Sequence, residues 1–185
     1  MKADNQHADH SAVESRLLEQ VARRDRAAFD ELYLLYHSRV FRFVYTLTHS
    51  HAMTDELVND VMLVIWEKAG SFRGDSKPST WIFGIAYRQA IRRLSRDKSR
   101  QAVGKRMPEP TFDDNAETEN WVQQGLEALP AEQHQCAILV FYLGLSYQEV
   151  AEVMNCPVNT VKTRMFHARR KLKLILPGIA EPGES

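Results

Sequence analysis

Apolar residues recur at three- and four-residue spacing along most of the chain, whereas the strict alternation of a β-strand is nearly absent. Asp25 is a suitable N-cap for the first clear helix. The apolar face of that helix is formed by Phe29, Leu32, Tyr33, Tyr36, Val40, Phe41, Val44 and Leu47. Thr54 is the expected N-cap of a second helix that ends near Ala69, and a third helix is expected from about Thr80 to Arg96. The pattern therefore predicts an all-α protein.

Residues 97–119 break this pattern. They contain few large apolar side chains, include Pro108 and Pro110, and change from basic to acidic along their length. Such a composition is typical of a flexible linker. Helical periodicity returns in the segments 121–129, 132–143, 147–154 and 157–176. We therefore predict two small helical domains, with this division of the chain: a disordered tail over 1–14, a domain over 15–96, the linker over 97–119, a domain over 120–176 and a tail over 177–185.

The second domain contains a helix-turn-helix pattern. Ser146 and Glu149 form the S-x-x-E pattern of a capping box, which predicts a helix start at Tyr147. Asn155 can adopt the left-handed conformation that ends this short helix, and Pro157 suits the first position of the next one. Two helices joined by a turn of about three residues have the geometry of a helix-turn-helix.

The second helix of this motif has two contrasting faces. Three- and four-residue spacing predicts a buried face of Val158, Val161, Met165, Ala168 and Leu172. The opposite face and its flanks contain Asn159, Lys162, Thr163, Phe166, His167, Arg169 and Arg170. Every charged residue from Pro157 to Leu174 is basic, and a phenylalanine among cations suits base edges, thymine methyls and phosphates. A DNA-recognition helix is favoured; an ordinary amphipathic basic helix is the alternative.

Two surfaces of opposite charge are expected in the first domain. Aromatic and basic residues follow one another in the order Phe72, Trp81, Phe83, Tyr87, Arg88, Arg92, Arg93, Arg96, Lys98 and Arg100. This mixture suits single-stranded nucleic acid, although Trp81, Phe83 and Ile85 also fit a hydrophobic core. The preceding helix carries on one side Asp55, Glu56, Asn59, Asp60 and Glu67. That acidic stripe would repel phosphate, so it indicates a basic protein partner or a solvated face.

Composition narrows the possible classes of protein. The 185 residues include 24 basic and 24 acidic side chains, and zero net charge argues against a histone-like general DNA binder. No secretory signal is visible and the apolar run VMLVIW is too short for a bilayer, so we expect a cytoplasmic protein without membrane insertion. Cys136 and Cys156 are expected to be reduced core thiols. Because no P-loop, metal-ligand cluster or nucleophile motif is found, we expect neither cofactor, metal, small-molecule substrate nor enzymatic activity.

Two runs of the chain resemble the sigma factors of bacterial RNA polymerase. The run that resembles sigma region 2 covers residues 54–96, TDELVNDVMLVIWEKAGSFRGDSKPSTWIFGIAYRQAIRRLSR. The run that resembles sigma region 4 covers residues 126–172, LEALPAEQHQCAILVFYLGLSYQEVAEVMNCPVNTVKTRMFHARRKL. With the linker between them, residues 15–176 resemble a sigma factor of the compact extracytoplasmic-function (group 4) type. The resemblance implies a protein that binds core RNA polymerase at its β′ clamp helices and β flap, recognises −10 and −35 promoter DNA, and is controlled by an anti-sigma factor.

The resemblance also implies roles for individual residues. Those matching the polymerase-docking positions are Asp55, Glu56, Asn59 and Asp60. Those matching the −10 surface are Phe72, Arg73, Gly74, Asp75, Ser76, Lys77, Ser79, Trp81, Tyr87, Arg88 and Arg92. Those matching positions that meet the −35 element are Lys162, Thr163, Phe166 and His167. The same helix adds four further candidates for the −35 surface: Asn159, Thr160, Arg169 and Arg170. His167 departs from the arginine common at its position, so the family's −35 preference does not carry over there.

Two other classes stay open on the residues alone. A helix-turn-helix regulator that does not replace a sigma factor would account for the second domain and leave the first unexplained. A nucleic-acid enzyme would need a catalytic motif, and none is found in the sequence.

Overall fold

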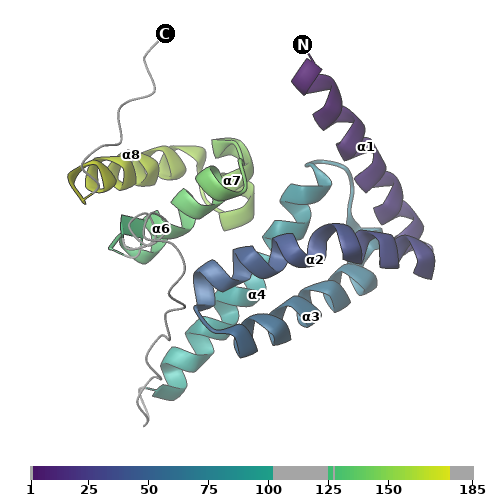
Figure 1. Cartoon of the computed structure of the whole chain (residues 1–185), viewed down its shortest axis with the longest axis horizontal. Helices are drawn as coiled ribbons and strands as arrows, with labels where there is room; N and C mark the ends of the chain where they lie inside the picture. The colour runs from purple at the N-terminus through teal and green to yellow at the C-terminus, as the bar shows by residue number, and fades with distance from the viewer. Residues whose placement is uncertain (1, 102–124, 127, 176–185) are drawn as a thin grey trace. The chain divides into compact units, whose positions relative to one another are not determined.

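The computed structural model describes residues 2–101, 125–126 and 128–175, and the helices among them confirm the all-α fold class (Figure 1). These elements divide into two compact units. The first contains α1 (Lys2–Ala22), α2 (Arg26–Thr48), α3 (His51–Lys68), the 3-10 helix η1 (Ala69–Ser71) and α4 (Pro78–Gln101). The second contains α6 (Ala131–Ala137), the π-helix η2 (Ile138–Tyr142), α7 (Tyr147–Met154) and α8 (Val158–Ile175).

Helix α1 begins inside the stretch 1–14, which the sequence predicts to be a disordered tail, and this part of the prediction is wrong. No glycine or proline precedes Gly70, so no residue in this stretch breaks a helix. The buried face of the helix consists of Leu17, Leu18 and Val21. Glu14 adds an ion pair to Arg39 of α2 at 3.6 Å. Packing against α2 therefore stabilises a helix whose first turns are too polar to indicate one.

The N-cap of α2 is the predicted one, whereas that of α3 is not. The Asp25 carboxylate accepts hydrogen bonds from two backbone N–H groups of the first turn of α2, at 2.9 and 3.2 Å. Helix α3 is capped by Ser50. Thr54 lies one turn inside α3, fully buried, and its hydroxyl donates to the Ser50 carbonyl at 2.7 Å. A threonine that bonds to the carbonyl four residues back is tolerated inside a helix, and for that reason it can be mistaken for a cap.

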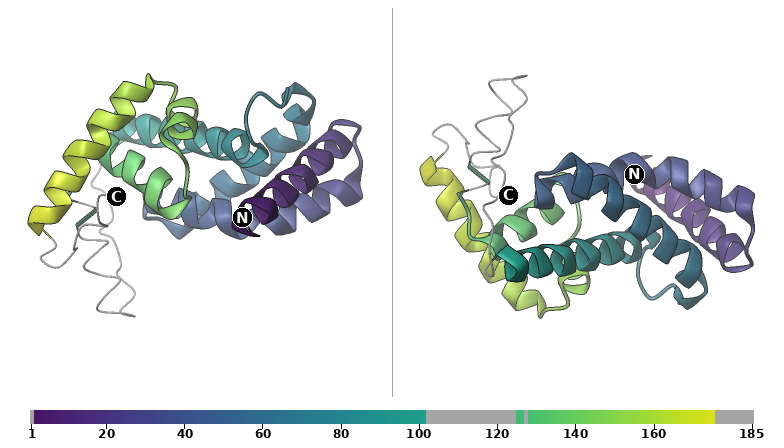
Figure 2. Two further views of the ribbon diagram at one scale, coloured as in Figure 1. Left: turned by 90° about the horizontal axis from the view of Figure 1, so that it is seen from above. Right: turned by 90° about the horizontal axis from the view of Figure 1, so that it is seen from below.

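Helices α1 to α4 enclose one hydrophobic core, with α2 in contact with the other three (Figures 1 and 2). Phe83 of α4 is fully buried in it, and its ring centroid lies 5.5 Å from that of Phe43 and 6.2 Å from that of Tyr36. Ile85 is buried as well, whereas Trp81 is only half-buried. Phe83 and Ile85 are therefore core residues, and of these three only Trp81 retains an accessible surface.

Helix α4 is longer than expected at both ends. Pro78 occupies its first turn, where a missing N–H group does no harm. Residues 97–101 continue the helix, so the predicted linker does not begin at 97; no glycine interrupts the chain until Gly104. Several predicted segments lie outside the described residues: 102–119 of the linker, 121–124 and 127 of the next helix, and the tail 177–185.

The second unit contains the predicted helix-turn-helix. The Glu149 carboxylate accepts the Ser146 N–H at 2.8 Å, and the Ser146 hydroxyl accepts the Glu149 N–H at 3.3 Å, so the capping box is confirmed. Asn155 has a φ of 51° and ends α7 in the left-handed conformation. Helix α8 begins one residue later than expected, and the Pro157 carbonyl accepts the N–H of Val161 at 3.3 Å. The predicted helix over 132–143 is present as α6 followed by η2.

Candidate functional surfaces

The acidic stripe of α3 faces away from the core. Asp55, Glu56, Asn59 and Asp60 are all exposed. The opposite face of the helix consists of the buried residues Thr54, Leu57, Val58, Val61, Met62 and Ile65. Within the described part of the chain, Asp55 and Asp60 form no ion pair, so both carboxylates are available to a partner.

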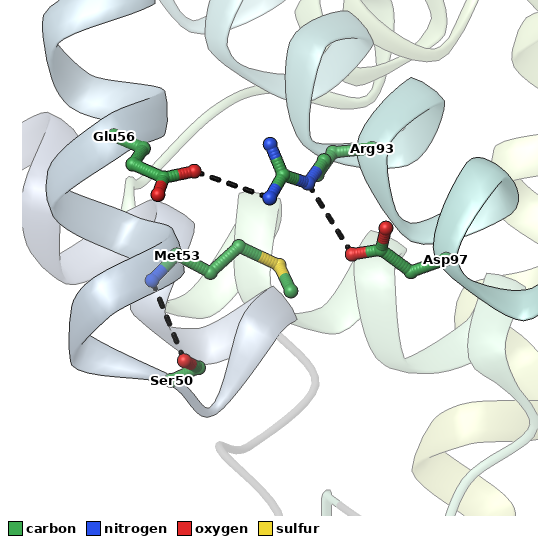
Figure 3. A network of polar contacts seen from close by, with 5 residues as sticks. All are labelled: Ser50, Met53, Glu56, Arg93 and Asp97. Carbon is green, nitrogen blue, oxygen red and sulfur yellow. Dashed lines mark hydrogen bonds and ion pairs between the residues drawn. The ribbon is translucent and has the colours of Figure 1, made fainter. Parts of the chain in front are cut away.

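Glu56 differs from its neighbours because it is bound to α4 (Figure 3). Its carboxylate lies 3.1 Å from Nη2 of Arg93, whose Nε donates to the Asp97 carboxylate at 3.3 Å. The hydrogen bond to Asp97 raises the pKa of the Arg93 guanidinium most, and the charges of Asp97 and then of Glu56 raise it further. Glu56 therefore helps to join α3 to α4, and Arg93 is occupied within the fold although it belongs to the basic run.

A surface groove of about 440 Å³ adjoins the acidic stripe, between α2 and α3. Its walls consist of Arg26, Phe29, Asp30, Tyr33, Asn59, Met62, Leu63 and Trp66. Leu63 is 53 % exposed, a large fraction for a leucine in a regular helix. Leu63 and Trp66 were not among the predicted site residues; the signal for Leu63 was its place three residues after Asp60, on the charged side of the helix.

The loop between η1 and α4 brings an aromatic pair to the surface. Phe72 and Trp81 are both half-buried, and their ring centroids lie 5.6 Å apart at an interplanar angle of 58°. Gly74 has a φ of 77°, a conformation that favours glycine. The other proposed −10 residues of the loop are exposed or half-buried: Arg73, Asp75, Ser76, Lys77 and Ser79.

Helix α4 continues this surface with cations. Tyr87 is half-buried, and Arg88 and Arg92 are exposed. Neither arginine has an ion-pair partner among the described residues, in contrast to Arg93. The loop and the exposed side of α4 thus combine an aromatic pair with unpaired positive charge.

Helix α8 has the predicted register. Its fully buried residues are Val161, Met165 and Ala168, with Leu172 nearly so and Val158 half-buried. The exposed residues are Asn159, Lys162, Thr163, Phe166, His167, Arg169 and Arg170, whereas Thr160 is half-buried. The Phe166 ring is 63 % exposed and meets His167 edge-on, with centroids 5.5 Å apart.

Two cations of α8 hold the helix in place. Arg164 forms an ion pair with Glu132 of α6, and its Nη1 lies 3.8 Å from Sγ of Cys156. Lys171 donates to the Ala128 carbonyl at 2.6 Å. Cys136 is fully buried, and burial raises the pKa of its thiol to about 11. Arg164 and Lys171 therefore stabilise the fold. The composition of the helix, in which every charged residue is basic, does not distinguish them from cations that are available to DNA.

Two aromatic residues of η2 are exposed although the sequence pattern did not predict it. Phe141 is 56 % exposed and Tyr142 is 46 % exposed. The guanidinium of Arg169 lies 5.9 Å from the centroid of the Phe141 ring.

Among the described residues there is no group of three or more His, Cys, Asp or Glu side chains suited to a metal ion, and no helix long and apolar enough to cross a membrane.

Two protein families match the chain, one in each unit. Residues 32–100 match the family described as sigma-70 region 2, and residues 119–172 match the family described as sigma-70, region 4. The first match contains the acidic stripe and the aromatic loop. The second contains the helix-turn-helix.

Characterised relatives match both units together. The chain is 29 % identical to the RNA polymerase sigma-H factor of Pseudomonas aeruginosa, over 91 % of this chain and 96 % of that protein. It is 30 % identical to the ECF RNA polymerase sigma factor SigM of Mycobacterium tuberculosis, over 90 % and 86 %. In fold it resembles the sigma factor RpoE of Bartonella quintana, solved in complex with the anti-sigma factor NepR, with a TM-score of 0.67, 24 % identity and coverage of 82 % and 98 %.

Proposed function

Because the chain belongs to the extracytoplasmic-function sigma factors of bacterial RNA polymerase, we propose that it binds core polymerase and directs it to promoters with −10 and −35 elements. The observation that carries this proposal is the outer face of α8, where Phe166 is 63 % exposed among cations with no acid on the helix. A helix-turn-helix regulator is not favoured, since residues 32–100 match sigma region 2. The protein acts in initiation without an active site of its own, in the cytoplasm where the polymerase is.

The polymerase-docking surface lies on α3. Asp55 and Asp60 supply unpaired carboxylates, Asn59 supplies an amide, and the adjoining groove supplies apolar area around Leu63. An apolar centre with a charged rim is the usual anatomy of a protein interface, and the charge of this rim favours a basic partner. The β′ clamp helices are the partner that the family implies. Glu56 contributes less, because Arg93 already neutralises part of its charge.

The −10 surface is formed by the loop and α4. Unstacked bases bind aromatic side chains, and the strand's phosphates bind cations. Phe72 and Trp81 provide the aromatic surface, and Arg88 and Arg92 provide the charge. Strand separation then follows from preferential binding of the single strand.

The −35 surface is the outer face of α8. A recognition helix places polar and apolar side chains against base edges in the major groove and cations against phosphates. Phe166, Thr163 and His167 lie at the centre of the exposed face, with Lys162 and Arg169 at its flank. An anti-sigma factor is the expected regulator, since it would compete for these exposed surfaces, and the β flap is the expected polymerase contact of the second unit.

The experiment is a titration of the labelled 185-residue chain with core polymerase, followed by selection of a randomised duplex library by the resulting holoenzyme. The double variant Asp55→Lys/Asp60→Lys should lose affinity for core by about tenfold or more, in the range of interface charge pairs. Glu19→Lys, an equal change of charge per site on α1, should bind as the wild type does. Unchanged affinity of the double variant would remove α3 from the docking surface. Enriched DNA should contain two conserved elements, and a single element would contradict two-site recognition.

A further inference from the structure

Gly84 occupies an unfavourable position for a glycine. It lies inside α4, where glycine is less stable than alanine because it loses more backbone freedom on folding. The residue is buried although it lies one turn after Trp81, on the side of the helix that carries the −10 residues. Its helical φ gives no backbone reason for a glycine.

The atoms that cover Gly84 belong to Arg88. A Cβ placed on Gly84 would lie 3.1, 3.5 and 3.7 Å from Nη1, Nη2 and Cζ of Arg88, which are its three nearest neighbours outside the helix backbone. The Arg88 side chain thus folds back one turn toward the N-terminus of α4, and its guanidinium lies on the bare backbone at Gly84. Helical side chains lean in this direction, but a Cβ on the previous turn normally occupies the space.

No charged group holds the guanidinium there. Among the described residues Arg88 has no ion-pair partner, and burial lowers its pKa without removing its charge. Trp81, Arg88 and Arg92 follow at spacings of seven and four, so they share a face of α4. The backward lean places the Arg88 guanidinium at Gly84, which lies only three residues after Trp81, a member of the Phe72–Trp81 pair.

We propose that Gly84 is a positioning residue: its missing side chain leaves the place in which the Arg88 guanidinium lies, directed toward the aromatic pair that receives the −10 strand. This inference rests on the proposed −10 surface. Glycine at this position makes α4 less stable than alanine would, and it fixes the orientation of the Arg88 guanidinium. An alanine at this position should therefore improve the helix and impair promoter opening.

The test uses holoenzyme assembled with the 185-residue chain and the promoter enriched in the library selection, with 2-aminopurine in its −10 element to report opening. Gly84→Ala should raise the Tm of the protein by about 2 to 8 °C. Gly84→Ala should slow promoter opening by about three- to tenfold. Arg88→Ala should slow it more, because that variant removes the charged contact entirely. In the Arg88→Ala background, Gly84→Ala should cause no further loss, because coupled residues are non-additive. Gly70→Ala is the control, since its Cβ would meet its nearest atom at an ordinary 3.8 Å.

The outcomes separate the two proposals. If Arg88→Ala opens the promoter as fast as the wild type, the −10 role of Arg88 is wrong and the inference about Gly84 fails with it. If Arg88→Ala is impaired and Gly84→Ala is not, the −10 surface stands and the positioning role is wrong. If Gly84→Ala slows promoter opening equally in the wild type and in Arg88→Ala, the positioning role is also wrong, since Gly84 would then act without Arg88.

Discussion

Two consecutive residues of α8 should have opposite functions, because the helix directs Met165 into the core and Phe166 into solvent. Met165 is fully buried, and truncation of such a side chain to alanine costs about 2–5 kcal/mol of unfolding free energy. Phe166 is 63 % exposed, so about 70 Å² of a ring of roughly 200 Å² is covered, worth at most about 2 kcal/mol. Residual burial in the unfolded chain and the better helix propensity of alanine reduce this to about 1 kcal/mol.

The assay combines urea unfolding of each variant with binding of the holoenzyme to the selected promoter. Met165→Ala should lower the unfolding free energy by the larger amount. Phe166→Ala should remain nearly as stable as the wild type and should lose about 1–3 kcal/mol of DNA binding free energy, the usual value for one base contact. A Phe166→Ala variant that binds the promoter normally would refute the assignment of this face to the −35 element. A large loss of unfolding free energy in Phe166→Ala would show that the Phe166 ring is buried and not exposed.

Three further predictions concern other residues. Lys162→Ala should weaken promoter binding and reduce the slope of log affinity against log salt by about one, as expected for one phosphate contact; an unchanged slope would exclude that contact. Thr54→Val should destabilise the protein by about 1–3 kcal/mol in urea titrations, because it removes the hydroxyl that donates to Ser50 and lies 2.8 Å from Oγ1 of Thr48. Burial raises the pKa of Cys136 to about 11, above the roughly 8.5 of an unfolded thiol. Its contribution to stability is therefore complete below about pH 8.5 and declines as the pH rises toward 11. Cys136→Ala should weaken the decline in stability between about pH 8.5 and 11, and an identical pH dependence would contradict the burial effect.

The register of α8 was predictable because it follows from a short-range pattern. Val161, Met165 and Ala168 repeat at three- and four-residue spacing, and this periodicity fixes which side chains face the core and which, such as Phe166, face solvent. The capping box at Ser146 was predictable for the same reason, since both of its partners lie within one turn.

The errors come from interactions between distant segments. Helix α1 is stabilised by contacts of its second half with α2, including the ion pair of Glu14 with Arg39, which no local pattern reveals. The sequence also cannot distinguish cations that are available to DNA from those that hold the fold together. Arg164 pairs with a residue 32 positions away, and Lys171 binds a carbonyl 43 positions away. From composition alone, Arg164 and Lys171 both count as part of the basic surface. The structure shows that each is engaged within the fold.

Run-off transcription with purified, sigma-free core polymerase tests the central claim most directly. The template is a linear duplex carrying the promoter enriched by the holoenzyme, with a second template in which both conserved elements are scrambled as the control. If the chain functions as a sigma factor, its addition to core polymerase should produce one transcript of defined length from the first template and none from the second. If core polymerase with the chain yields the same products as core polymerase alone on both templates, the account is contradicted.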